Sequence, residues 1–200
     1  MPDIIFNGFL KIKDAIIRPF GQTDPPVGNT NGGLEAFLIT HGLIPENGQK
    51  GAAGYGILTT NTRTGDGSLI VATTHAGVLD SAEQDGIQDP VWHNHMVKLG
   101  TDSAHCGTAP AVSQITWEQP GDVQITGRTA HLIGIPNQFS SPSSFNPSGP
   151  DQTYEPGNVV ERVVSFKLVP VPASGGSAPG GTLDAVCVTE ITDAENLIIR

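Results

Sequence analysis

Glycine and proline punctuate this sequence from one end to the other, and that feature constrains its fold more than any other. The 25 glycines and 16 prolines are spread along the 200 residues and are not collected in one linker. Because both residues interrupt helices and mark turns, this distribution disfavours long helices and favours many short strands. A chain of this length commonly folds as one all-β unit, so we expect a single domain over residues 1–200.

Short runs of β-branched and other apolar residues recur between these turns. Each run is bounded by Gly, Pro, Asn or Asp, which is typical of antiparallel strands. We predict about nine strands, at residues 4–9, 35–40, 56–62, 69–79, 91–99, 111–117, 123–135, 159–171 and 185–191. Residues 11–18 fit either a further strand or a short helix, and long loops are predicted at about 21–33, 138–157 and 172–181. The expected architecture is an antiparallel β-sandwich or barrel.

The charge balance limits the partners of the chain. Ten Lys and Arg residues against twenty Asp and Glu residues give a formal net charge of −10. An acidic surface repels phosphate backbones, so we expect no nucleic-acid partner. No apolar run is long enough to cross a bilayer, so we expect no membrane insertion. A homo-oligomer or a surface assembly remains open.

The two cysteines bear on the compartment in which the protein works. Cys106 and Cys187 lie far apart in the sequence, and their even number favours a disulfide and an oxidising compartment. Two free thiols are the alternative. The first residues lack the basic region of a signal peptide. We therefore expect an extracellular or exported protein whose signal has been removed, with a cytoplasmic protein as the alternative.

The pair His93 and His95 is the feature most directly suggestive of chemistry. In a strand, side chains two residues apart share one face. The pair therefore stands on the apolar side of residues 91–99, together with Val91, Val97 and Leu99, while Trp92, Asn94, Met96 and Lys98 face the other way. Both imidazoles can turn toward one metal ion from these positions.

Two further histidines are predicted to face inward by the same alternation. His131 is in phase with Val123 and Ile125, and His75 is in phase with Leu69 and Val71. We predict a metal site formed by His93, His95, His131 and His75. Imidazole ligands favour copper or zinc over magnesium and calcium, which prefer oxygen ligands. Metal-dependent redox or hydrolytic activity would follow from an open coordination position.

The alternative is a non-enzymatic structural or interaction module. In that interpretation each histidine bonds a carbonyl, a carboxylate or a buried water, and the protein is a surface, filament or particle subunit. His105 and His41 are predicted to be loop residues. The sequence contains no His-Glu-x-x-His, Gly-x-Ser-x-Gly or Cys-x-x-Cys motif, and no catalytic residue can be assigned from it.

Three short patches of the sequence resemble the copper-zinc superoxide dismutases. They are His93-Asn94-His95 with the following Cys106, the glycine-rich residues 180–187 that end in Cys187, and Phe145-Asn146-Pro147. The resemblance implies a β-sandwich with a copper-binding histidine pair. Ser144 stands where that family has its bridging histidine, and no aspartate or arginine matches the family's zinc ligand or its anion-steering residue. We use the resemblance as an analogy in architecture.

Overall fold

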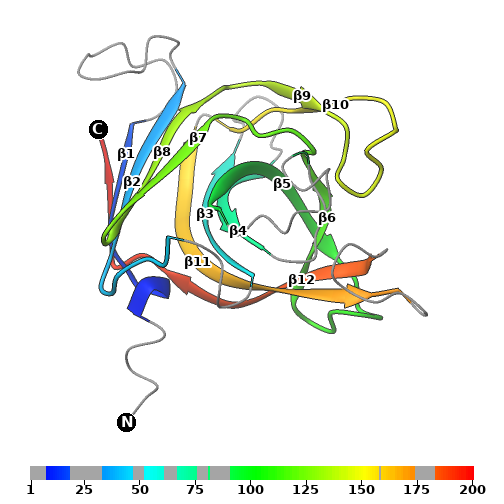
Figure 1. Cartoon of the computed structure of the whole chain (residues 1–200), viewed down its shortest axis with the longest axis horizontal. Helices are drawn as coiled ribbons and strands as arrows, with labels where there is room; N and C mark the ends of the chain where they lie inside the picture. The colour runs from blue at the N-terminus through cyan, green and yellow to red at the C-terminus, as the bar shows by residue number, and fades with distance from the viewer. Residues whose placement is uncertain are drawn as a thin grey trace.

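Six strands close into a barrel, which the computed structural model shows as a ring (Figure 1). The structure describes residues 8–18, 33–46, 52–60, 67–75, 81, 91–157, 159–173 and 183–200. The barrel order is β11-β12-β6-β5-β4-β3. The strands are β3 (Ala53–Thr60), β4 (Gly67–Thr74), β5 (His93–Thr101), β6 (Pro110–Ile115), β11 (Val159–Pro172) and β12 (Leu183–Asp193). The predicted all-β fold is confirmed.

A five-stranded sheet lies beside the barrel, in the order β13-β1-β2-β8-β7 (Figure 1). Its members are β1 (Ile12–Arg18), β2 (Leu34–Thr40), β7 (Asp122–Thr126), β8 (Thr129–Ile135) and β13 (Asn196–Ile199). Two short strands, β9 (Phe139–Ser141) and β10 (Gln152–Tyr154), pair with each other. They lie within the residues 138–157 that the sequence predicts as a loop, so that prediction is wrong for these six positions.

The described residues form two apolar cores, and β5 contributes to both. One core fills the space between the barrel and the five-stranded sheet and includes Met96 of β5 and Trp92, which directly precedes β5. The other fills the barrel lumen and includes Val97, Leu69 and Phe166. Burying one such side chain stabilises a fold by about 1.5–3 kcal/mol. Trp92 and Met96 lie on the face opposite the histidines, as predicted, but that face is buried as well, so the prediction that the histidine face is the one apolar side is wrong.

Two glycines of β3 make room in the lumen. A Cβ atom on Gly54 would lie 2.8 Å from Cζ of Phe166, and one on Gly56 would lie 2.8 Å from Cδ1 of Leu69. Real Cβ atoms do not come this close to another carbon, so any larger residue would displace these side chains. The glycines thus let the two large apolar side chains occupy the lumen.

Residues 12–18 form strand β1, so the helix alternative for residues 11–18 is wrong. The apolar residues Ile12, Ala15 and Ile17 are buried. Ile12 and Ala15 are three residues apart, a spacing that is typical of one face of a helix. The cause is an irregularity in the pairing of β1 with β2 between Ile12 and Asp14, which shifts the alternation by one residue. Of the first predicted strand, Gly8 and Phe9 lie in the 3-10 helix η1 (Gly8–Leu10), and the remainder is outside the described residues.

Residues 123–135 form a hairpin of β7 and β8, where the sequence predicts one strand. The turn lies at Gly127, whose φ of 60° is readily adopted by glycine. Gln124 pairs with His131 and Val123 pairs with Leu132 across the hairpin. Paired residues share a face, so the turn reverses the alternation between its two arms. The predicted loops at 21–33 and 172–181 lie almost entirely outside the described residues.

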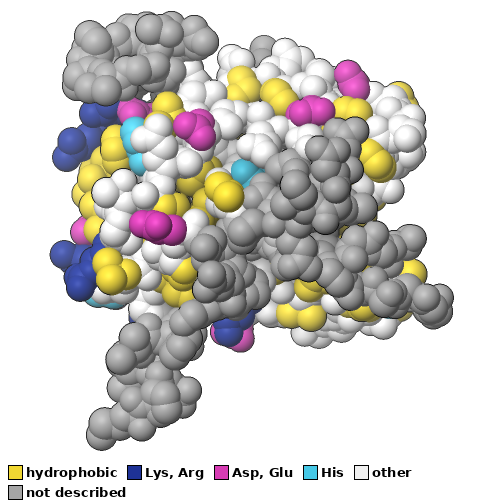
Figure 2. Space-filling model, viewed as in Figure 1, with side chains coloured by type: hydrophobic (Ala, Val, Ile, Leu, Met, Phe, Trp, Pro, Cys, Tyr) yellow, Lys and Arg dark blue, Asp and Glu magenta, His cyan; other side chains and the backbone are white. Residues whose placement is uncertain are grey.

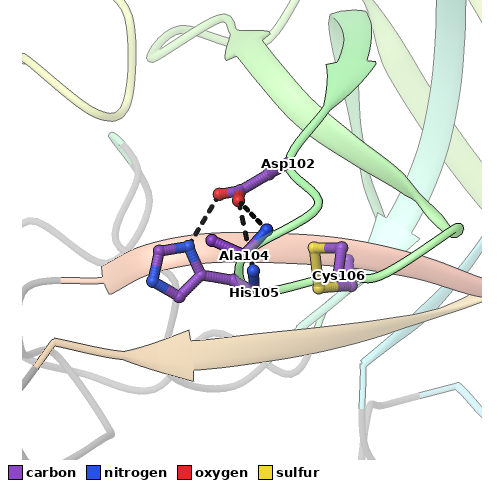
Figure 3. Close-up of a disulfide and its surroundings, with 5 residues drawn as sticks. Asp102, Ala104, His105 and Cys106 are labelled. Carbon is purple, nitrogen blue, oxygen red and sulfur yellow. Dashed lines mark hydrogen bonds and ion pairs between the residues drawn. A yellow bond between two sulfur atoms is a disulfide. The ribbon is translucent and has the colours of Figure 1, made fainter.

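A disulfide joins Cys106 to Cys187 at the point where the barrel has its thinnest pairing (Figure 3). Strands β12 and β6 are in register at one pair, Cys187 with Ala111. Cys106 belongs to the turn that precedes β6, so the bridge fastens this turn to β12. Among the described residues no helix is long enough and apolar enough to cross a membrane.

Candidate metal centre

Strand pairing brings three histidines together inside the barrel. On β5, His93 pairs with Thr73 and His95 pairs with Val71 of β4. The alternation that points Val71 and Thr73 into the lumen continues along the chain to His75. The exposed fractions of His75, His93 and His95 are 2%, 3% and 0%. The three imidazoles are therefore shielded from solvent on the inner wall of the barrel.

The rings are near enough for one ion to contact all three after their side chains shift, because bonds of about 2.0–2.1 Å bring the nitrogens to about 3.3 Å from one another. One ring nitrogen can be chosen from each histidine such that all three lie within 4.8 Å of one another. The shortest separation is 2.9 Å, between Nε2 of His93 and Nε2 of His75. The ring centroids lie 4.7 Å apart for His75 and His93 and 4.8 Å apart for His93 and His95.

Backbone carbonyls fix the orientation of two of the rings. Nδ1 of His93 lies 2.8 Å from the carbonyl oxygen of Val91, and Nδ1 of His95 lies 2.9 Å from the carbonyl oxygen of Thr116. A carbonyl only accepts hydrogen bonds, so Nδ1 donates in each case. In the neutral rings Nε2 then carries the lone pair, which is the arrangement found in metal-binding histidines.

The contact between His75 and His93 is compatible with either a proton or a metal ion. Since Nε2 of a neutral His93 accepts, Nε2 of His75 donates to it across the 2.9 Å separation when no ion is bound. Two nitrogens bound to one tetrahedral ion at about 2.0–2.1 Å would lie about 3.3 Å apart. Conversion of the pair into two ligands therefore needs the nitrogens to separate by a few tenths of an ångström, the rings to turn toward the ion, and the proton on Nε2 of His75 to move to its Nδ1 or to leave.

Thr116 and Ser144 help to hold the His95 ring in place through hydrogen bonds, a role that was not predicted from the sequence. The Thr116 carbonyl accepts from Nδ1 of His95 and also from the Ser144 hydroxyl, at 3.0 Å. The Thr116 hydroxyl lies 3.3 Å from the amide nitrogen of Met96, which donates to it. Contacts made through a backbone carbonyl leave no motif, so nothing in the sequence could have revealed them.

The structure places His131 in a different environment. Its Nε2 lies 2.8 Å from Oε1 of Glu35, and its ring stacks on Phe37 at a centroid distance of 4.0 Å. The other carboxylate oxygen of Glu35 accepts from Arg18 at 2.8 Å. His131 is on β8 of the five-stranded sheet and is not among the three clustered histidines. The predicted inward phase of His131 with Val123 is wrong, because the β7–β8 turn intervenes.

The remaining histidines are at the surface, as predicted. His105 lies in the turn before β6, and its Nδ1 donates to Asp102 at 2.8 Å (Figure 3). This hydrogen bond raises the pKa of His105 and lowers the pKa of Asp102. His41 contacts the carboxylate of Glu195 at 2.9 Å. Neither residue lies with the clustered histidines.

The acidic residues do not form a second obvious site on the visible surface. Figure 2 shows one face of the molecule, on which the described Asp and Glu side chains are scattered rather than gathered in one patch.

No protein-family model, no curated protein and no solved structure matches this chain. The geometry of the three buried histidines is thus the basis for inferring function.

Proposed function

We propose that this protein binds one transition-metal ion, copper or zinc, in the barrel lumen through His75, His93 and His95. The observation that carries the proposal is the convergence of three buried imidazoles, with ring nitrogens within 4.8 Å of one another. Burying three neutral rings side by side is costly unless their polar atoms are engaged. One ion engages a nitrogen of each ring at once.

The donor set favours a borderline ion with an open position. Imidazole nitrogens suit copper and zinc better than magnesium or calcium. Within the residues that the structure describes, no fourth His, Cys, Asp or Glu joins the cluster. Three protein ligands leave one position of a tetrahedral ion for water or a substrate, which is typical of catalytic sites. Lewis-acid or redox chemistry follows from that arrangement.

The proposal is tested by metal content. Protein reloaded with copper or zinc and then desalted is expected to retain about one equivalent per chain, as one three-histidine site requires. Replacing His93 and His95 together with glutamine removes two of the three ligands and is expected to abolish retention. The matched control is His131→Gln, which changes a histidine outside the cluster and is expected to retain the metal.

A specific observation supports the rival interpretation, a structural module with core histidines. The 2.9 Å contact between His75 and His93 is a good hydrogen bond by itself. This rival predicts that wild-type protein retains no metal after desalting. Unchanged retention in the double variant would also contradict the proposed ligands.

We further propose that the protein works outside the cytoplasm. The disulfide between Cys106 and Cys187 supports this location, because such bridges persist mainly in oxidising compartments. Protein isolated from its native source is expected to yield no alkylated cysteine when it is denatured under non-reducing conditions. Two alkylated cysteines by mass spectrometry would contradict the location.

A further inference from the structure

The lumen contains a small cavity that the described residues line with mostly apolar side chains. Its volume is about 20 Å³, counted as the space open to the centre of a water-sized sphere. A cavity needs about 10–15 Å³ on this scale to hold one water molecule. Its walls come from β4, β5, β6, β11 and β12, and most are apolar side chains, Leu69, Val71, Val97, Ile115 and Phe166 among them. The hydroxyl of Thr73, which also lines it, donates to the carbonyl of Ala53.

The cavity is lined by strand neighbours of the clustered histidines. Val71 is paired with His95 across β4 and β5, and Thr73 is paired with His93. Val97 follows His95 by two residues on the same face of β5. Three wall residues are therefore immediate neighbours of the two histidines whose Nε2 lone pairs face a prospective ion.

A second hollow lies beside the cavity, nearer the other end of the barrel. It has a volume of about 370 Å³ and shares Leu69, Val97 and Leu99 with the cavity. Its remaining lining includes polar side chains from β3, β4 and β11: Thr59, Thr60, Ser68 and Glu161. His93 begins β5 and Leu99 lies near its end, so the histidines and this hollow lie at different levels of the barrel. The inner cavity thus shares three wall residues with a wider, more polar hollow on the side away from the histidines.

We infer that the lumen cavity binds a small apolar molecule beside the histidine-bound metal ion. This inference rests on the proposed function and identifies the ligand class of the same site. The described wall is apolar apart from Thr73, whose hydroxyl already donates to Ala53, so it favours molecules that need no hydrogen bond over water. The volume fits about two non-hydrogen atoms, the size of dioxygen or of the smallest hydrocarbons.

Xenon is the probe for the cavity, because dry apolar cavities bind it. The experiment measures xenon binding by ¹²⁹Xe NMR on metal-free wild-type protein and on two lumen variants. Val71→Leu adds a methylene to the wall and is expected to weaken xenon binding about tenfold. Val97→Ala removes two methyl groups and is expected to strengthen it. Ile70→Val is the matched control, since Ile70 faces the other core and should leave xenon binding unchanged.

Copper(II) tests whether the cavity lies at the metal. In copper-loaded protein the unpaired electron is expected to accelerate the relaxation of bound xenon, and zinc-loaded protein is expected to show no such effect. Dioxygen and ethylene then separate the two sources of an apolar ligand. Selective oxygen-induced relaxation of lumen methyl groups supports dioxygen, whereas displacement of xenon by ethylene alone supports a hydrocarbon.

The outcomes separate this inference from the proposed function. Retained copper together with absent xenon binding, or with xenon relaxation that copper leaves unchanged, would overturn the inference alone. Failure of the wild type to retain any metal would overturn the proposed function and the inference with it. If Val71→Leu does not fold, Val97→Ala still decides the matter, because unchanged or weakened xenon binding in that variant contradicts the cavity assignment.

Discussion

Removing the disulfide is expected to destabilise the barrel where its pairing is thinnest. The variant carries Cys106→Ala and Cys187→Ala, which avoids leaving a buried hydroxyl in place of sulfur. The bridge closes a loop with a sequence separation of 81 residues. It also lies at the junction of β6 and β12, where Cys187 and Ala111 form the one registered pair. Few backbone hydrogen bonds therefore compensate for its loss.

The size of the effect follows from the loop. Chain-entropy arguments assign a loop of this length about 4.5 kcal/mol near room temperature, and native disulfides removed from small secreted domains cost about 2–5 kcal/mol. We expect the free energy of unfolding to fall by about 2–4.5 kcal/mol. That is a large part of the roughly 5–15 kcal/mol that stabilises a typical domain.

The assay is equilibrium unfolding in urea of oxidised wild type, reduced wild type and the double variant. Reduced wild type and the variant should agree, since both lack the same bridge. Ser113→Ala is the matched control, because it changes one exposed hydrogen bond on β6 and should cost no more than about 1 kcal/mol. A double variant within about 1 kcal/mol of oxidised wild type would refute the reasoning, since it would show that the bridge does not constrain the unfolded chain.

Three further predictions concern side chains outside the histidine cluster. Glu35→Gln removes a buried charge that accepts from His131, and it is expected to lower the free energy of unfolding by about 1–3 kcal/mol while metal content stays unchanged. Asp102→Asn should lower the pKa of His105 toward its ordinary value in an NMR titration. Because that pKa is raised in the fold, the stability contributed by His105 is present below pH 6.5 and is lost as the pH rises through the raised value. Tyr55→Phe removes a buried O–H donor to a backbone carbonyl and should cost about 0.5–1.5 kcal/mol by urea unfolding. Unchanged stability in the first or third variant, or an unchanged titration in the second, would contradict the corresponding contact.

The inward orientation of His93 and His95 was predictable because β5 pairs regularly. Five consecutive residues of β5 pair with β4 without an irregularity, so a simple count of alternate residues holds along the whole segment. The same regular alternation along β4 also places His75 at the cluster. Sequence alone could not show that the opposite face of β5 is buried as well. That burial depends on the five-stranded sheet, which local alternation does not reveal.

Two of the failed predictions, for residues 11–18 and for His131, have a common physical cause, a local irregularity that changes the alternation. An irregular pairing between Ile12 and Asp14 gives β1 the apolar spacing of a helix. The turn at Gly127 reverses the face of every residue that follows it and places His131 opposite Gln124. A glycine within an alternating run can mark such a turn, and weighing it would have removed His131 from the predicted ligands.

The position of the metal ion tests the central claim most directly. Crystals of copper- or zinc-loaded protein would be measured at the absorption edge of that metal, and an anomalous difference map would locate the ion. The account predicts one strong peak in the barrel lumen, about 2.0–2.1 Å from Nε2 of His93 and of His95 and within bonding distance of a ring nitrogen of His75. No peak at these three histidines, or a single peak at another place on the protein, would contradict it.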